Sequence, residues 1–247
     1  MTKAAYIGVD GKARKIKNGY VGVNGRARKI KKAYVGVGGV ARPCWGGGEL
    51  SYYGTIAPLS AIRSSLAATS VGDYALFGGG YHFSNYSAVD AYNSALTRST
   101  PTALSQARSS LAATSVGDYA LFGGGGIAFG HVVDAYNSAL TRSTPSGLSA
   151  IRANLAATSV GDYALFGGGY GSGNYYSAVD AYNSALTRST PSGLSQARAN
   201  LAATSVGDYA LFGGGYSSGY YSAVDAYNSA LTRSTPTALS QARSSLA

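Results

Sequence analysis

LAATSVGDYALFGGG at residues 66–80 decides the fold of this chain, because the same stretch begins again at Leu111, Leu155 and Leu201. The copies are spaced by 45, 44 and 46 residues, and DAYNSALTRSTP recurs inside each of them. A period in the forties that carries several strand-like runs and a glycine cluster is typical of propeller blades. Because one blade cannot bury both faces of its small sheet, we expect neighbouring blades to stack on one another.

The first copy, residues 66–110, predicts four strands. An inner strand of small side chains covers 66–71, and a hydrophobic strand covers 74–77 before a glycine triplet that permits unusual dihedrals. A third strand covers 89–92, and an outer strand covers 96–100. The other three blades are expected at 111–154, 155–200 and 201–245.

The number of blades stays open at this point. Residues 51–60 align with the outer strand at 96–105, and the chain stops at Ala247, where a fifth inner strand would begin. We therefore expect an all-β propeller of four to five four-stranded blades over 51–247, with residues 51–60 as an outer strand. Either four blades close alone, or a ring of five is cut short, or chains complete one another. Of these alternatives we favour a closed or nearly closed ring of four to five blades.

Residues 1–45 form a separate basic arm. They carry eleven Lys or Arg against Asp10, whereas residues 46–247 carry nine Arg against nine acids. Tyrosines recur here with a period of 14, each followed by Asp-Gly, Asn-Gly or Gly-Gly, which are the pairs of a type I′ turn. The sequence predicts successive β-hairpins, then a glycine-rich linker at 46–50.

The cations of the basic arm are candidates for assembly or attachment. An isolated hairpin is marginal, so we expect the arm to need a partner, either another copy of the chain or a surface on a larger particle. Clustered cations also bind phosphates, so nucleic-acid binding is an alternative. The residues concerned are Lys12, Arg14, Lys15, Lys17, Arg26, Arg28, Lys29, Lys31 and Lys32.

The variable part of each blade follows the glycine triplet and is the candidate ligand site. The four copies read YHFSNYSA, GIAFGHV, YGSGNYYSA and YSSGYYSA, and their equivalent positions place all four loops on one face. Tyrosine with Ser, Gly and Asn is typical of binding loops, although unconstrained drift gives similar variation. The candidates are Tyr81, His82, Phe83, Asn85, Tyr86, Phe129, His131, Tyr170, Asn174, Tyr175, Tyr176, Tyr216, Tyr220 and Tyr221.

The charges that recur once per blade are interpreted as structural. An arginine precedes each inner strand (Arg63 in the first blade), and an aspartate stands at each first turn (Asp73). We expect these groups to pair between blades or to cap turns. Asp90 and its equivalents either bond to neighbouring backbone, which we favour, or converge on a cation.

Composition argues against several classes of protein. No apolar run is long enough for a membrane span or a secretory signal, so we expect synthesis in a cytoplasm. Cys44 is alone, which excludes an intrachain disulfide and a cysteine-based zinc cluster. There is no Gly-x-Ser-x-Gly elbow, and every blade acid is a repeat member, so we expect no enzyme, no cofactor and no metal site.

Two resemblances add to these expectations. YALFGGG and Val-Asp-Ala-Tyr resemble the second and third strands of a kelch blade, although the usual outer-strand tryptophan is missing. The whole chain, with its Tyr-Ile/Val-Gly-Val hairpins and ARPCW junction, resembles repeat-rich tail or fibre proteins of phages and prophages of Gram-positive bacteria.

The second resemblance implies a place in a virion or tail-like particle that is assembled in a bacterial cytoplasm. The loops would bind a bacterial surface ligand, most plausibly a glycan, and other tail proteins or further copies of the chain would be partners. A purely structural tail component and a nucleic-acid-associated protein are the alternatives. No membrane insertion is expected.

Overall fold

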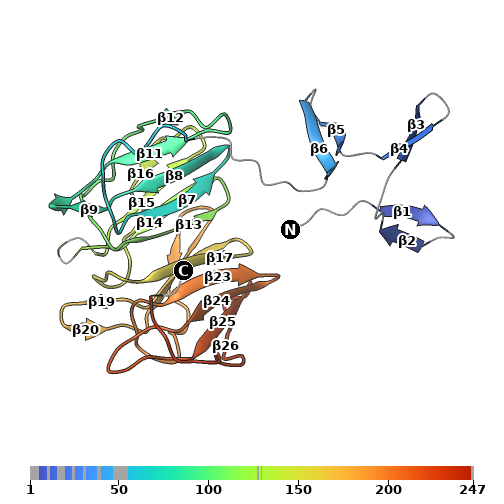
Figure 1. The fold of residues 1–247 in the computed structure, drawn as a ribbon. Coiled ribbons are helices and arrows are strands. Elements are labelled where there is room, and N and C mark those ends of the chain that lie inside the picture. The colour runs from blue at the N-terminus through green and yellow to red at the C-terminus, as the bar shows by residue number, and fades with distance from the viewer. Residues whose placement is uncertain are drawn as a thin grey trace. The chain divides into compact units, whose positions relative to one another are not determined.

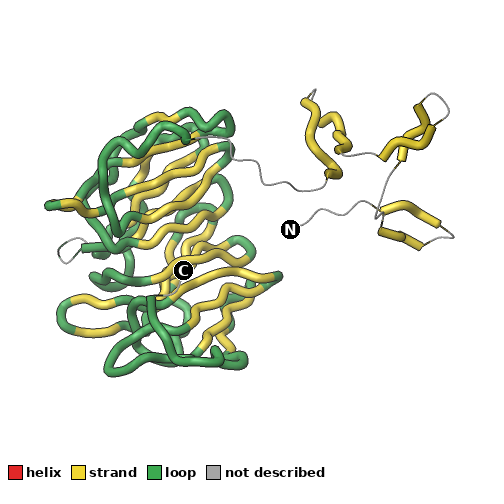
Figure 2. Tube along the Cα trace, viewed as in Figure 1, coloured by secondary structure: helices red, strands yellow, loops and turns green. Residues whose placement is uncertain are grey.

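The computed structural model describes residues 6–9, 12–15, 20–23, 26–29, 32–37, 40–46, 55–126, 128 and 130–245 (Figures 1 and 2). These residues form strands and loops without any helix in the described ranges. The chain divides into two compact units, Met1–Gly54 and Thr55–Ala247.

The first unit contains three β-hairpins, as the sequence predicted. They pair β1 (Tyr6–Val9) with β2 (Lys12–Lys15), β3 (Tyr20–Val23) with β4 (Arg26–Lys29), and β5 (Lys32–Val37) with β6 (Val40–Gly46). Val9 lies opposite Lys12 and Ile7 opposite Arg14. Apolar and charged residues therefore face each other across the ladder. Lys17 and Lys31 lie outside the described residues.

The second unit consists of four antiparallel sheets of four strands, which confirms the all-β propeller architecture. Blade 1 contains β7 (Ala67–Val71), β8 (Tyr74–Gly78), β11 (Val89–Tyr92) and β12 (Arg98–Ser99). Blade 2 contains β13 (Ala112–Val116), β14 (Tyr119–Gly123), β15 (Val133–Asn137) and β16 (Arg142–Ser143). Blade 3 contains β17 (Ala156–Val160), β18 (Tyr163–Gly167), β21 (Val179–Asn183) and β22 (Arg188–Ser189). Blade 4 contains β23 (Ala202–Val206), β24 (Tyr209–Gly213), β25 (Val224–Asn228) and β26 (Arg233–Ser234).

The outer strands are shorter than the sequence predicted. Strand β12 covers Arg98–Ser99, because Leu96 belongs to the preceding turn with a φ of 60°. Asn93 Oδ1 accepts the backbone N–H groups of Ala95 and Thr97 and so closes this turn. Residues 55–60 form no strand, so the outer strand predicted over 51–60 is absent from its described part.

The blades stand side by side with their inner strands adjacent (Figure 1). Strand β13 packs between β7 and β17, and β17 packs between β13 and β23. Strands β23 and β7 do not pack together in this way. The four blades therefore form an open row, not the closed or nearly closed ring that we favoured from the sequence. Among the described residues, the first and last blades each keep one face without a neighbouring blade.

The core lies at the junctions between successive blades. At the first junction, Val71, Leu76 and Val89 of blade 1 are buried against Phe122 and Tyr136 of blade 2. The other two junctions repeat this set with equivalent residues. Inside blade 2 the rings of Phe122 and Tyr136 are perpendicular, at 87°, with centroids 6.0 Å apart. Such a pair contributes about 0.5–1.5 kcal/mol beyond the area that it buries.

A connecting segment runs through each junction, from the outer strand of one blade to the inner strand of the next. The three internal segments are residues 102–110, 146–154 and 192–200, and residues 57–65 and 237–245 are the equivalent terminal segments. Their last residues form a ladder along which each backbone N–H donates to the preceding carbonyl at 2.8–2.9 Å. The ladder is Ser65, Ser110, Asn154, Asn200 and Ser245, all with φ between 52° and 57°.

Candidate functional site

A buried arginine–aspartate pair fixes each connecting segment on the blade that follows it. Arg108 Nη2 lies 2.7 Å from Asp134 Oδ2 and also donates to the carbonyl of Phe122 at 3.0 Å. Both side chains are fully buried. The equivalent pairs are Arg63–Asp90, Arg152–Asp180 and Arg198–Asp225. The blade arginines therefore pair with the third-strand aspartates, not with those of the first turn.

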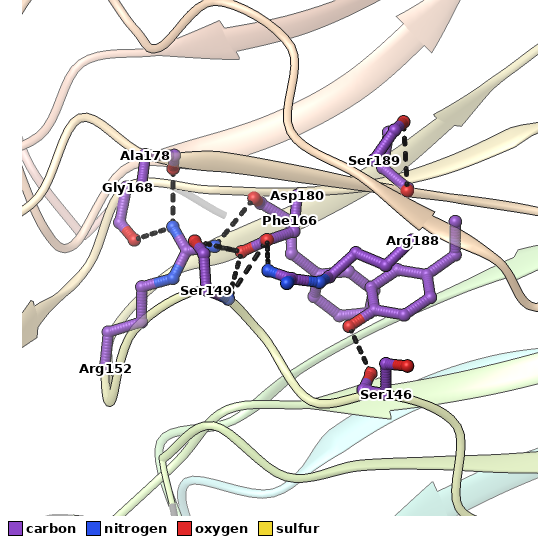
Figure 3. A network of polar contacts seen from close by, with 11 residues as sticks. Ser146, Ser149, Arg152, Phe166, Gly168, Ala178, Asp180, Arg188 and Ser189 are labelled. Carbon is purple, nitrogen blue, oxygen red and sulfur yellow. Dashed lines mark hydrogen bonds and ion pairs between the residues drawn. The ribbon is translucent and has the colours of Figure 1, made fainter.

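Figure 3 shows the third of these networks. Asp180 accepts hydrogen bonds from the guanidinium of Arg152, from Arg188 Nη1 at 2.8 Å and from the backbone N–H of Ser149 at 3.1 Å. Burial lowers the pKa of Arg152, and the charge of Asp180 opposes this shift. Several donors bind both oxygens of this carboxylate. The network therefore stabilises the fold, and Asp180 is not free to act as an acid, a base or a metal ligand.

The recurring acids do not gather around a cation. Within the described ranges, no group of three or more His, Cys, Asp or Glu side chains is arranged as metal ligands. Each third-strand aspartate instead bonds to an arginine and to the backbone N–H of a serine. This is the hydrogen-bonded alternative that the sequence analysis favoured.

The variable loops follow the second strand of each blade and differ in local structure. Loop 1 contains a small hairpin, β9 (Tyr81–His82) with β10 (Ser84–Asn85), and loop 3 contains β19 (Tyr170–Gly171) with β20 (Asn174–Tyr175). Loop 4 contains a single bridge between Tyr216 and Tyr220. Loop 2 forms no such pair among its described residues, and Phe129 lies outside them.

The loops of blades 1, 2 and 3 enclose a groove of about 720 Å³. Tyr81 and Asn85 of loop 1 and Tyr170 of loop 3 line the groove. The ends of two connecting segments and loop 2 supply further lining residues. These are Ser109, Ser110, Ala153, Asn154, Gly126 and Ala128. Tyr81 is 49 % exposed and Tyr170 is 40 % exposed, so both rings are open to a ligand.

One residue of loop 2 explains why the groove lies here. The position after the glycine triplet is tyrosine in three blades (Tyr81, Tyr170 and Tyr216) but glycine in blade 2, at Gly126. Each of the three tyrosines forms a β-bridge to the connecting segment, as Tyr170 does with Ala153. Gly126 has no side chain to fill that place, so the space between the neighbouring tyrosines stays open.

A second aromatic feature joins loops 3 and 4. Tyr175 packs on Tyr170 with ring centroids 5.0 Å apart and on Tyr216 at 6.1 Å, and Tyr216 packs on Tyr220 at 5.4 Å. Partial desolvation and then the neighbouring Tyr216 and Tyr170 raise the pKa of Tyr175. This row of rings adjoins the groove through Tyr170.

The structure separates the candidate loop residues into four sets. Tyr81, Asn85 and Tyr170 line the groove, and Tyr175, Tyr216 and Tyr220 form the row of rings. Tyr86, Tyr176 and Tyr221 are half-buried, and their carbonyls accept the N–H of the arginine in the connecting segment. His82, Phe83, His131 and Asn174 are exposed but do not line the groove.

The groove residues outside the variable loops were not predicted from the sequence. Ser109 donates a hydrogen bond from its hydroxyl to Asn85 Oδ1 at 2.9 Å, and Ser110 and Asn154 belong to the backbone ladder. Their signal in the sequence was weak, because these positions recur in every blade. The break in the tyrosine pattern at Gly126 was the one feature that pointed to this place.

Comparisons with known proteins support the fold. No protein-family model matches the sequence, and no curated protein matches it. Among solved structures, the chain is similar to the one described as "Structure of YjhT", with a TM-score of 0.63 and 13 % identity. The similarity covers 75 % of this chain and 74 % of that one. At this identity the likeness shows the fold alone. The described part of the chain holds no helix capable of crossing a membrane.

Proposed function

We propose that the protein is a non-enzymatic binding component of a virion or tail-like particle, and that its propeller recognises a bacterial surface glycan. The groove between Tyr81 and Tyr170 is the observation that carries this proposal. Two exposed rings line a groove whose other lining residues include serine and asparagine. Tyrosine supplies a rigid surface for stacking on a sugar ring, and amide and hydroxyl groups bond to sugar hydroxyls.

Binding accounts for this site better than catalysis does. The groove offers phenol, amide and hydroxyl groups, and none of the described residues that line it is a carboxylate. The third-strand aspartates are buried in arginine pairs and so cannot act as acid or base toward a ligand. A tail or fibre role rests on the resemblance of the hairpins, the ARPCW junction and the blades, and the basic arm would supply the attachment.

Binding to isolated cell walls of a Gram-positive bacterium tests the proposal. The full chain is compared with the double variant Tyr81→Ser/Tyr170→Ser and with Tyr220→Ser, which removes an exposed tyrosine that does not line the groove. We expect the double variant to lose at least tenfold in affinity and Tyr220→Ser to bind within about twofold of the native chain. Periodate treatment of the walls, which cleaves sugar diols, is expected to abolish native binding.

Two other results would contradict the proposal in different ways. Equal binding by all three proteins that falls steeply with salt would assign the attraction to the basic arm. Absence of binding by the native chain would leave a purely structural component of the particle.

A further inference from the structure

The free face of blade 4 lacks a covering that every earlier blade has. Val206 is 62 % exposed, whereas the equivalent Val71, Val116 and Val160 are each 4 % exposed inside a junction. Tyr209, on the adjacent strand, is exposed as well. A hollow of about 820 Å³ lies on this face and is lined by Leu211, Val224 and Leu239, among others. It is the place that the next blade would fill.

The missing group at this hollow is a phenylalanine ring. In each internal junction, a Cβ added to the last glycine of the second strand would meet the phenylalanine of the next blade at 2.7–2.8 Å. The pairs are Gly78 with Phe122, Gly123 with Phe166, and Gly167 with Phe212. A Cβ on Gly213 would meet no ring, and its nearest neighbour would be Val224 Cγ2 at 3.7 Å.

Blade 1 presents the complementary half of a junction. Phe77 is only half-buried, whereas Phe122, Phe166 and Phe212 are completely buried. On the same face Leu96 is 51 % exposed, although the equivalent residue of blade 2, Leu140, packs against a junction core. Phe77, at one end of the row, therefore has no glycine of another blade against it. Gly213, at the other end, has no phenylalanine ring against it.

Each terminal connecting segment makes only half of the polar contacts that an internal segment makes. An internal segment bonds to both blades: Leu104 N–H donates to the carbonyl of Ser87 in blade 1, and Arg108 pairs with Asp134 in blade 2. Segment 57–65 makes the second kind of contact, as in Arg63–Asp90. Segment 237–245 makes the first kind, as in Leu239 N–H to the carbonyl of Ser222.

We propose that the two ends of the blade row are the halves of a fourth junction, completed by a second copy of this chain. Blade 1 of one copy docks on blade 4 of the other, and Phe77 covers Gly213. A junction holds one connecting segment, so segment 237–245 displaces segment 57–65 of the partner copy. Both segments keep Leu, Ser and Arg at the same positions, which places Arg243 beside Asp90 in place of Arg63.

A second copy is the occupant because the chain's own blade 1 is not within reach. Strands β7 and β23 do not pack together, whereas every successive pair of inner strands does. The exposed faces carry the same residues that the internal junctions bury. Each free face is therefore complementary to the opposite free face of another copy of this chain. A head-to-tail contact of this kind closes into a ring or continues into a longer row. The inference is independent of the proposed glycan binding.

Light scattering on the full chain, coupled to size exclusion, tests the inference. We expect the native chain to show a concentration-dependent mass above the 25.1 kDa of one copy. Val206→Asp, which introduces a charge at an exposed site, is expected to reduce that mass at least twofold at the same concentration. Phe83→Asp is the matched control, because Phe83 is 88 % exposed and its position in the blade is not one that the internal junction cores contain, so it should keep the native mass.

A second variant distinguishes weakened association from misfolding of the chain. Gly213→Ala fits the isolated blade but places a Cβ where Phe77 of the partner would stand, so it should weaken association as Val206→Asp does. Circular dichroism melting establishes that each variant is folded. A native chain that is monomeric at every concentration would overturn the inference. The same mass for the native chain and for folded Val206→Asp and Gly213→Ala would also overturn it.

Discussion

The ring of Phe166 in blade 3 lies flat against the backbone of Gly123 in blade 2, and a Cβ added to Gly123 would stand 2.7 Å from Cε1 of the ring. Phe166 is completely buried at this contact. Absence of a side chain at Gly123 thus sets the distance at which two blades pack. The glycine triplet does more than permit a turn, because its first member forms part of the surface on which the next blade rests.

Gly123→Ala is therefore expected to destabilise the propeller by about 1–3 kcal/mol, the usual cost of overpacking a core. Urea denaturation followed by circular dichroism measures the change. Gly219→Ala is the matched control, since no atom lies within 4 Å of a Cβ at that position. Equal stability of the two variants would mean that the phenylalanine ring moves aside without cost.

Asp180→Ala is expected to destabilise the chain by about 3–5 kcal/mol, because it leaves the buried guanidinium of Arg152 without its counter-charge. Arg188→Ala removes a partner of the same carboxylate whose side chain is 29 % exposed, and it should cost only about 0–1 kcal/mol. Denaturant midpoints measure both changes. Similar losses of stability for the two variants would contradict the assignment of Arg152–Asp180 as the main stabilising pair of this network.

The stability of the propeller should fall in alkaline solution. Burial, and then the charge of Asp180, raise the pKa of the Tyr182 hydroxyl well above its ordinary value. The unfolded chain loses this proton near pH 10, so the contribution of Tyr182 is complete below that pH and is lost as the pH rises further. Tyr136 and Tyr227 behave in the same way.

Tyr182→Phe should make this loss less steep, since the phenol no longer titrates. At neutral pH the variant should lose about 1 kcal/mol, because the hydroxyl donates to the carbonyl of Ser146 at 2.8 Å. Free energies of unfolding at several pH values above neutrality measure both effects. Tyr220→Phe, at an exposed position, is the control for the loss of a tyrosine hydroxyl.

The backbone ladder predicts which side chains its positions accept. Ser110 has a φ of 57°, in the left-handed region, and a β-branched residue there costs about 1–3 kcal/mol. Ser110→Val should therefore lower the thermal midpoint, and Ser110→Asn should not, because Asn154 and Asn200 occupy equivalent positions with a φ of 53°. An unchanged thermal midpoint for Ser110→Val would show that the backbone ladder adjusts without loss of stability.

Much of the fold could be predicted from the repeat itself. The period fixed the blades, and the alternation within each copy located the second and third strands within a residue or so. The outer strand was predicted too long, because the turn closed by Asn93 and Leu96 was not recognised. Whether the row closes depends on the angle between successive blades, which arises from packing and has no signal in a repeated sequence.

The site was harder to predict for a related reason. Exposure and variation marked the loops correctly as loops, but the groove exists because blade 2 has Gly126 where three blades have tyrosine. The recurring loop tyrosines were recognised as candidates, but the replacement of one of them by Gly126 was not. The partner of each blade arginine was likewise ambiguous, since first-turn and third-strand aspartates recur with the same period.

The near-identity of the junctions has a consequence for how this chain could change in length. Every blade offers the same surface to the blade before it and to the blade after it, because Phe122, Phe166 and Phe212 meet equivalent glycines. Deletion of residues 111–154 would join Ser110 to Leu155 and seat blade 3 on blade 1 through contacts of the same kind. Gene segments that encode whole blades are thus interchangeable units, and recombination between them alters the length of the row without creating an unfamiliar interface.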